Sequence, residues 1–185
     1  MPQDVDDLIG LLGGKEAFVD KLDEFFSNSD RSDYINCNAS GFVGQYVQGN
    51  EPNHHAAFLY NYAGAPRKTQ KMVHRIIDEY YTDKSDGYAG NDDCGQMSAW
   101  YIFSSMGFYP VNPASDEYSL TSPVFSKIRV HLSNGKTFTI EAPRKSESEI
   151  YIRKMTLNGA PYKSNILKYS DIMDGASLTF RLTSR

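Results

Sequence analysis

The stretch Ile128–Ile140, IRVHLSNGKTFTI, alternates apolar and polar residues on both sides of Asn134-Gly135. Alternation with a period of two is typical of a half-buried β-strand, and Asn-Gly between two such runs is a strong hairpin signal. The stretch therefore predicts two antiparallel strands. Similar patterns follow in Ile150–Leu157, which ends at a second Asn-Gly pair, and in Leu178–Leu182, so we expect an antiparallel β region at this end of the chain.

Upstream of this hairpin the apolar residues recur at helical spacing instead. We predict five helices, over residues 4–12, 15–26, 54–63, 66–81 and 95–106. Helices first and strands later indicate an α+β fold rather than alternating βαβ units. We expect a helical part over residues 1–112 and a β-strand region over 113–185. The helical layer is thin for an enzyme pocket, which indicates that it belongs to a larger assembly of helices.

The formal net charge of −4 is the sum of two unlike parts. Residues 1–110 carry 16 acidic and 8 basic side chains, a net of −8, whereas residues 111–185 carry 7 and 11, a net of +4. This balance argues against a nucleic-acid partner. The chain has no run of about 18 apolar residues, so we expect no membrane span. Residues 1–7 do not resemble a signal peptide, so the protein is expected to be cytosolic or to have a leader outside these residues.

Two polar loops, Gln48–His55 and Gly87–Gln96, each precede a predicted helix and are not needed for a core. A structural interpretation is that their side chains cap the following helices. The candidate caps are Asn50, Glu51, Asp92 and Asp93. A functional interpretation is that the loops act together, because glycosidic hydrolysis commonly needs two carboxyl groups and oxygen-rich loops bind hard cations such as calcium. Trp100 suits either a core or the apolar face of a sugar. The residues alone leave these interpretations open.

Four motifs in and around these loops are long and specific: YVQGNEPNHH (46–55), LYNYAG (59–64), GNDDCGQMSAWY (90–101) and MGFYPV (106–111). Together they resemble glycoside hydrolase family 92, and the resemblance covers most of residues 1–182. It implies a calcium-dependent, exo-acting α-mannosidase, often α-1,2-specific, that inverts the anomeric centre and acts on α-mannosides or mannose-rich glycans. It also implies a β-sandwich followed by an (α/α)6 toroid, of which the helices here form part. Family members are typically exported by bacteria, to the periplasm or cell surface.

The resemblance also implies roles for individual residues. Asp93 matches the general base that activates the attacking water, and Asn91 matches a position that supports this base. The first loop matches a segment with calcium and sugar contacts. There we predict Gln48, through its main chain, and Asn50 and Glu51, through their side chains, as metal ligands, and Asn50, Glu51 and His54 as substrate-binding residues.

In the resembling family the general acid lies in a motif upstream of the part that matches this chain. The resemblance therefore implies a C-terminal portion of a longer enzyme, with the N-terminal part as its natural partner. Taken alone, the chain is expected to be inactive and prone to self-association, because its helix faces lack their neighbours. One alternative is a non-catalytic carbohydrate- or calcium-binding module. Another is a different enzyme on the same toroid, such as a phosphorylase or lyase.

Overall fold

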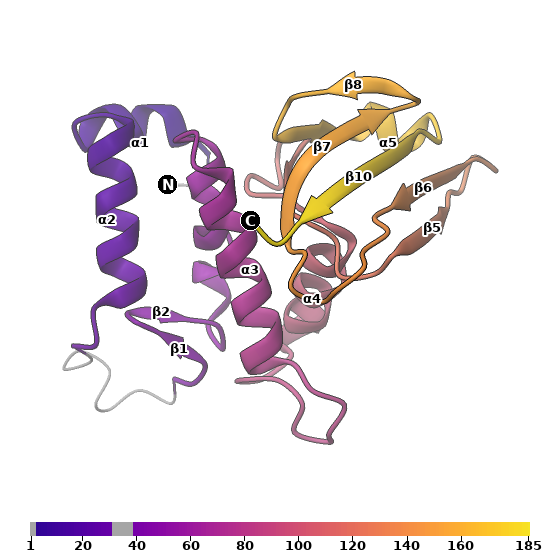
Figure 1. The fold of residues 1–185 in the computed structure, drawn as a ribbon. Helices are drawn as coiled ribbons and strands as arrows, with labels where there is room; N and C mark the ends of the chain where they lie inside the picture. The colour runs from indigo at the N-terminus through magenta and orange to yellow at the C-terminus, as the bar shows by residue number, and fades with distance from the viewer. Residues whose placement is uncertain (1–2, 31–38) are drawn as a thin grey trace.

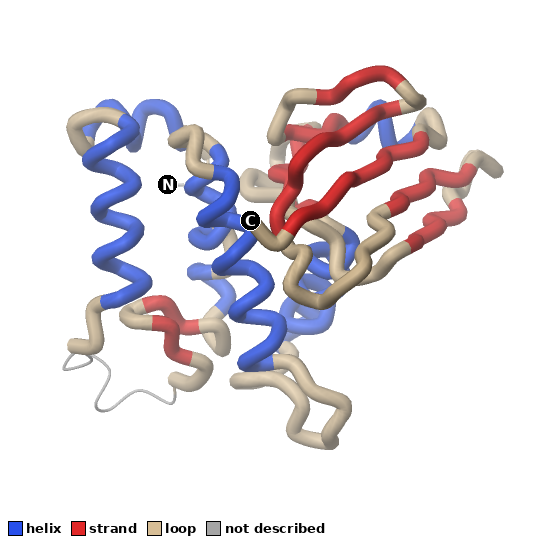
Figure 2. The backbone as a smooth tube through the Cα atoms, in the orientation of Figure 1, coloured by secondary structure: helices blue, strands red, loops and turns tan. Residues whose placement is uncertain are grey.

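The computed structural model describes residues 3–30 and 39–185, and it divides into a helical half and a β half (Figures 1 and 2). The helical half contains four α-helices: α1 (Val5–Leu11), α2 (Lys15–Ser27), α3 (Pro66–Tyr80) and α4 (Gln96–Met106). Shorter elements lie between them: β1 (Phe42–Val43), β2 (Tyr46–Val47), and the 3-10 helices η2 (Glu51–Asn53), η3 (Ala56–Asn61) and η4 (Asp93–Gly95). In the described part of the chain, no helix is long and apolar enough to cross a bilayer.

The prediction of an α-helix over residues 54–63 is wrong, because this segment forms 3-10 turns. The indole Nε1 of Trp100 donates a 3.0 Å hydrogen bond to the His54 carbonyl, which would accept from Phe58 in an α-helix. The Phe58 N–H donates instead to the His55 carbonyl, at 3.0 Å. A buried side chain from a distant helix thus selects the tighter turn, and the local spacing could not reveal it.

The β half contains a five-stranded sheet with the order β5-β6-β10-β7-β8 (Figure 1). Its strands are β5 (Lys127–His131), β6 (Thr137–Glu141), β7 (Tyr151–Leu157), β8 (Ala160–Tyr162) and β10 (Ser177–Thr183). The predicted hairpins form at both Asn-Gly turns, and the α+β fold class is confirmed. One pair departs from the antiparallel expectation, because β10 runs parallel to β6. The chain reaches β10 through a long crossover, which parallel pairing requires.

A three-stranded sheet adjoins the first, with the order β3-β4-β9. Its members are β3 (Phe108–Tyr109), β4 (Glu117–Leu120) and β9 (Ile166–Lys168), which leads into the short helix α5 (Tyr169–Met173). β3 follows α4 directly, where Gly107 adopts a φ of 98° and ends the helix. Phe108 packs in the core of the β half, whereas Tyr109 and Val111 pack in the helical core. The two cores therefore meet close to the predicted division after residue 112, which stays a prediction.

Buried polar side chains join the two halves. Asn61 donates 2.7 Å hydrogen bonds to Ser119 Oγ and to the Leu120 carbonyl. On α3, Gln70 accepts from the Ile152 N–H at 3.0 Å, and His74 Nε2 lies 2.9 Å from Ser122 Oγ. Because buried polar groups cost free energy unless they are paired, these bonds fix how the sheet sits on α3.

Candidate active site

The first loop is anchored through Gln48, which is completely buried. Its amide oxygen accepts from the hydroxyl of Tyr46, and its amide nitrogen donates to the hydroxyl of Tyr81 at 2.7 Å. Its main-chain carbonyl oxygen lies 2.9 Å from His54 Nε2. The side chain is therefore engaged within the protein, and the carbonyl keeps one lone pair. The metal role of Gln48 through its main chain stays a prediction.

His54 connects the first loop to α4. Its Nδ1 lies 3.0 Å from the amide nitrogen of Gln96, which can only donate, so Nε2 carries the proton and donates to Gln48. Burial lowers the pKa of His54, with the main-chain bond to Gln48 and the charge of Glu51 opposing this shift, so the ring is neutral at pH 7. Both nitrogens have protein partners and the side chain is buried. His54 therefore links Gln48 of the first loop to Gln96 of α4. Its contact with substrate stays a prediction.

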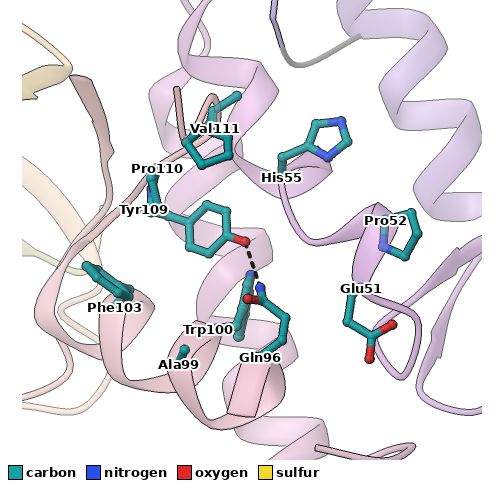
Figure 3. Close-up of a pocket in the computed structure, with 11 residues that line it drawn as sticks. Glu51, Pro52, His55, Gln96, Ala99, Trp100, Phe103, Tyr109, Pro110 and Val111 are labelled. Carbon is teal, nitrogen blue, oxygen red and sulfur yellow. Dashed lines mark hydrogen bonds between the residues drawn. The ribbon is translucent and has the colours of Figure 1, made fainter. Parts of the chain in front are cut away.

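A cavity of about 640 Å³ lies between the first loop and α4 (Figure 3). It is lined by Glu51, Pro52, His55, Gln96, Ala99, Trp100, Phe103, Tyr109, Pro110, Val111 and Pro113. Gln96 donates a 3.0 Å hydrogen bond to the Tyr109 hydroxyl, shown as a dashed line. The sequence alone assigned no role to Gln96 or His55, although both lie in the motifs quoted above. Of the predicted site residues, all of which are described, only Glu51 lines this cavity.

Among the described residues that line this cavity, Glu51 alone has a carboxylate. Its Oε1 is buried and has no hydrogen-bond partner within the described part of the chain. An orphaned buried carboxylate oxygen is a natural acceptor for a sugar hydroxyl or a ligand for a hard cation. Asn50, its neighbour, is exposed. Among described residues, no group of three or more His, Cys, Asp or Glu is placed to hold a metal ion. Calcium takes six to eight oxygens, so the loop fits only part of such a site.

In the second loop the two aspartates have different surroundings. Asp92 lies before Gly95, the N-cap residue of α4, and its carboxylate satisfies the first turn of the helix: Oδ1 accepts from the Ser98 N–H and Oδ2 from the Ser98 hydroxyl, both at 2.8 Å. The capping interpretation is thus confirmed for Asp92. Asp93 is exposed and lies in the left-handed region, with a φ of 24°. Cys94 and Gly95 follow with φ of 57° and 84°.

Three consecutive left-handed residues are uncommon, and each non-glycine costs about 1–2 kcal/mol. Strained backbone of this kind clusters at functional sites, where the surrounding structure maintains it. Here the strain presents Asp93 to solvent immediately before α4. The pattern is invisible in the sequence except for Gly95, because nothing local demands positive φ at Asp93 or Cys94.

The two loops meet at a pair of glycines. A Cβ built on Gly90 would lie 2.7 Å from the Gly49 carbonyl oxygen, and one built on Gly49 would lie 3.2 Å from the Gly90 Cα. Real Cβ atoms do not approach backbone oxygen at the first distance, so the contact requires glycine at position 90. The structure therefore brings the first loop, with Asn50 and Glu51, beside the second loop, with Asn91 and Asp93.

Comparison with known proteins gives consistent results. A sequence model of the glycosyl hydrolase family 92 catalytic domain matches residues 1–184. A secreted glycosidase of Arthroderma benhamiae is 34% identical in an alignment of 185 positions, which covers 98% of this chain and 22% of that protein. An α-mannosidase of the family from Bacteroides thetaiotaomicron, solved with mannoimidazole, is 41% identical with a TM-score of 0.92. An inverting mannosidase of the family from the same bacterium is 38% identical with a TM-score of 0.85.

The match to both solved structures extends over 100% of this chain but over only 24% and 26% of theirs. The chain thus spans about a quarter of the length of its solved relatives. Across that span the sequence match and the backbone match agree with one assignment. The chain belongs to glycosyl hydrolase family 92 and corresponds to part of its catalytic domain.

Proposed function

We propose that this chain is part of an exo-acting α-mannosidase, to which it contributes the general base and one side of the calcium and sugar site. The observation that carries the proposal is the meeting of the two loops at Gly49 and Gly90, beside the strained turn that exposes Asp93. Two relatives support the substrate class, since one is an α-mannosidase bound to mannoimidazole and the other is an inverting mannosidase.

In an inverting glycosidase one carboxylate activates water while a carboxylic acid protonates the leaving oxygen, about 6.5–9.5 Å away. We assign the first role to Asp93, whose exposed carboxylate has room for a water molecule, and a supporting hydrogen bond to the Asn91 amide. The acid would come from residues outside this chain. On this proposal the isolated chain binds part of a mannoside but does not cleave it.

Calcium would be held partly by the first loop, through the Glu51 carboxylate, the Asn50 amide oxygen and the Gln48 carbonyl. The buried Glu51 Oε1, for which the described residues provide no hydrogen-bond partner, supports this set. When bound, the ion would supply a positive charge that orients sugar hydroxyls. The carboxylate and amide oxygens of the loop would hold one side of the ion, and water or residues outside this chain would complete its coordination.

We also propose that the parent protein is exported and acts on mannose-rich glycans outside the cell. The secreted glycosidase among the relatives supports export, and because it is fungal, the relatives are not confined to bacteria. Association with the rest of the parent enzyme would cover apolar side chains such as Leu11, which is 85% exposed, and Ile102, which is 54% exposed.

The test is a chimaera in which this chain replaces the matching quarter of the Bacteroides thetaiotaomicron α-mannosidase. We expect calcium-dependent release of mannose from an α-1,2-mannobiose. Asp93→Asn should lower kcat by about 10²–10⁴-fold, the usual contribution of a general base, and leave KM nearly unchanged. Asp86→Asn, at an exposed aspartate of the preceding loop, is the matched control and should retain activity.

Full activity of the Asp93→Asn chimaera would contradict the assigned base. A chimaera that folds and binds mannose but never hydrolyses it would favour the binding-module alternative. Calcium-dependent turnover by the isolated 185-residue chain would contradict the location of the acid outside it.

A further inference from the structure

A second cavity, of about 780 Å³, lies on the β half along β7, β8 and β10, which adjoin one another in Figure 1. It shares no lining residue with the cavity beside Glu51. Four of its ten lining residues are basic: Arg153, Lys154, Lys163 and Arg181. No acidic side chain is among the described residues that line it. We call this cavity the basic groove.

A β-bulge brings two of these cations together. Arg181 of β10 pairs with Lys154 of β7, whereas the next residue, Leu182, pairs with Ile152, so Arg153 has no partner in the ladder. The extra residue breaks the alternation of the strand, and Arg153 and Lys154 are both exposed although they are adjacent. Bulges that re-aim side chains are frequent next to functional sites.

The charges in the basic groove are not balanced. Lys154 and Arg181 lie directly opposite each other in the register, an arrangement that destabilises a sheet when the charges are alike. Within the part of the chain that the structure describes, neither these two nor Arg153 and Lys163 form an ion pair. By contrast, Lys127 of the same sheet pairs with a carboxylate across the strands. A bound anion would remove the repulsion that the fold otherwise retains.

The groove also offers neutral donors and a suitable size. Thr156 and Thr179 are cross-strand partners two residues from Lys154 and Arg181, so their side chains lie on the same face of the sheet. Ligand sites usually measure about 300–1,000 Å³. The guanidinium group matches the geometry of phosphate and sulfate oxygens, which it binds through two parallel hydrogen bonds.

We propose that the basic groove binds an oxyanion of the phosphate or sulfate class, as the free ion or as an ester on a sugar. Arg181 and Arg153 supply paired hydrogen bonds, Lys154 and Lys163 supply charge, and the hydroxyls of Thr156 and Thr179 donate further hydrogen bonds to the anion. This site is independent of the hydrolytic site proposed above, and its ligand is bound rather than cleaved.

The experiment is calorimetric titration of the 185-residue chain with inorganic phosphate and, separately, with a sulfated oligosaccharide, at constant ionic strength. A neutral mannose oligosaccharide serves as the ligand control. We expect saturable binding of phosphate or of the sulfated sugar, and which of the two binds more tightly identifies the source of the oxyanion. Arg181→Gln should weaken binding about tenfold, the effect of losing a charged hydrogen bond.

Arg129→Gln is the matched control, because Arg129 is an exposed arginine on β5 outside the groove. It changes the net charge equally and should leave affinity unchanged. Thermal unfolding checks the fold, and without ligand Arg181→Gln should unfold at the same or a higher temperature since it removes a like-charge contact. Absence of binding by both anions, or an equal loss in Arg129→Gln, would overturn the proposal.

Discussion

The two loops of the candidate active site are held in place by different means. The first loop is fixed by buried hydrogen bonds, which connect Gln48 and His54 to two tyrosines and to α4. The second loop has a single capping carboxylate, Asp92, followed by three left-handed residues. The first loop therefore depends on polar partners from distant segments, whereas the second holds local backbone strain. The first loop contains the candidate metal ligands, and the second loop exposes Asp93, the candidate base.

The largest expected effect on stability comes from removing the buried hydrogen bonds that hold the first loop. His54→Ala removes the partner of the buried Gln48 carbonyl and of the Gln96 amide, and leaves space beside Trp100. We expect the unpaired buried groups to lower the free energy of unfolding by about 3–4 kcal/mol in total. Denaturant unfolding of the variant measures this loss. His131→Ala, at an exposed histidine of β5, is the control and should change stability little. Equal stabilities for the two variants would mean that His54 does not brace the loop.

Acid should destabilise the protein through its buried histidines, His54 of the first loop and His74 of α3. Burial, aided by the nearby charge of Arg144, lowers the pKa of His74 to about 4, and burial lowers that of His54 in the same direction. Both folded rings are thus neutral, so stability is full above the unfolded value near 6.5 and is lost as the pH falls through the folded pKa.

For His74 we expect the free energy of unfolding to fall by on the order of 3 kcal/mol between pH 6.5 and 4. Denaturant unfolding at several pH values measures it, and His74→Gln should flatten the profile over this range. A variant whose profile has the same slope as the unmodified chain would exclude His74 as the group responsible.

The contact between the loops can be tested with two glycines of nearly equal φ. Gly90 has a φ of 76° and touches Gly49, whereas Gly64 has a φ of 78° and would place a Cβ in open space. Alanine at either site has the same backbone strain, but at position 90 it also forces the loops apart. We expect Gly90→Ala to lose about 2 kcal/mol more than Gly64→Ala in unfolding experiments. Matching losses would argue against a close approach of the loops.

The smallest expected effect is a gain in the free energy of unfolding. Cys94→Gly relieves left-handed strain in the second loop and should raise the free energy of unfolding by about 0.5–1 kcal/mol, less than the full strain because glycine has more freedom when unfolded. Ser85→Gly, at an exposed loop residue without positive φ, should instead destabilise slightly. A loss of stability in Cys94→Gly would show that the thiol makes a contact worth more than the strain.

Most elements were predictable because their patterns are local. Helical spacing located α1, α2, α3 and α4 to within two residues, and both Asn-Gly pairs formed the expected hairpins. Short strands such as β3 and β9 were missed, because two or three residues carry no period to detect. The parallel pair of β6 and β10 was missed as well, since strand direction within a sheet depends on the path of the chain.

In the candidate site, too, local features could be predicted from the sequence and long-range contacts could not. The motifs around Glu51 and Asp93 could be found in the sequence, because residue types and their order are local information. The roles of their neighbours could not, since Gln48 is bonded to a tyrosine 33 residues away and His54 to a glutamine 42 residues away. Those partners exist only once the loop is packed against α3 and α4.

The sequence by itself determined the α+β order, the family and the two loops, because hydrophobic period, turn chemistry and motif identity are properties of adjacent residues. Only the tertiary structure decided the 3-10 turns before α3, the contact of Gly49 with Gly90, the capping role of Asp92 and the gathering of basic side chains at the β7 bulge. Each of these depends on groups that are distant in sequence, and their geometry is fixed only when buried polar atoms find partners and backbones come into contact.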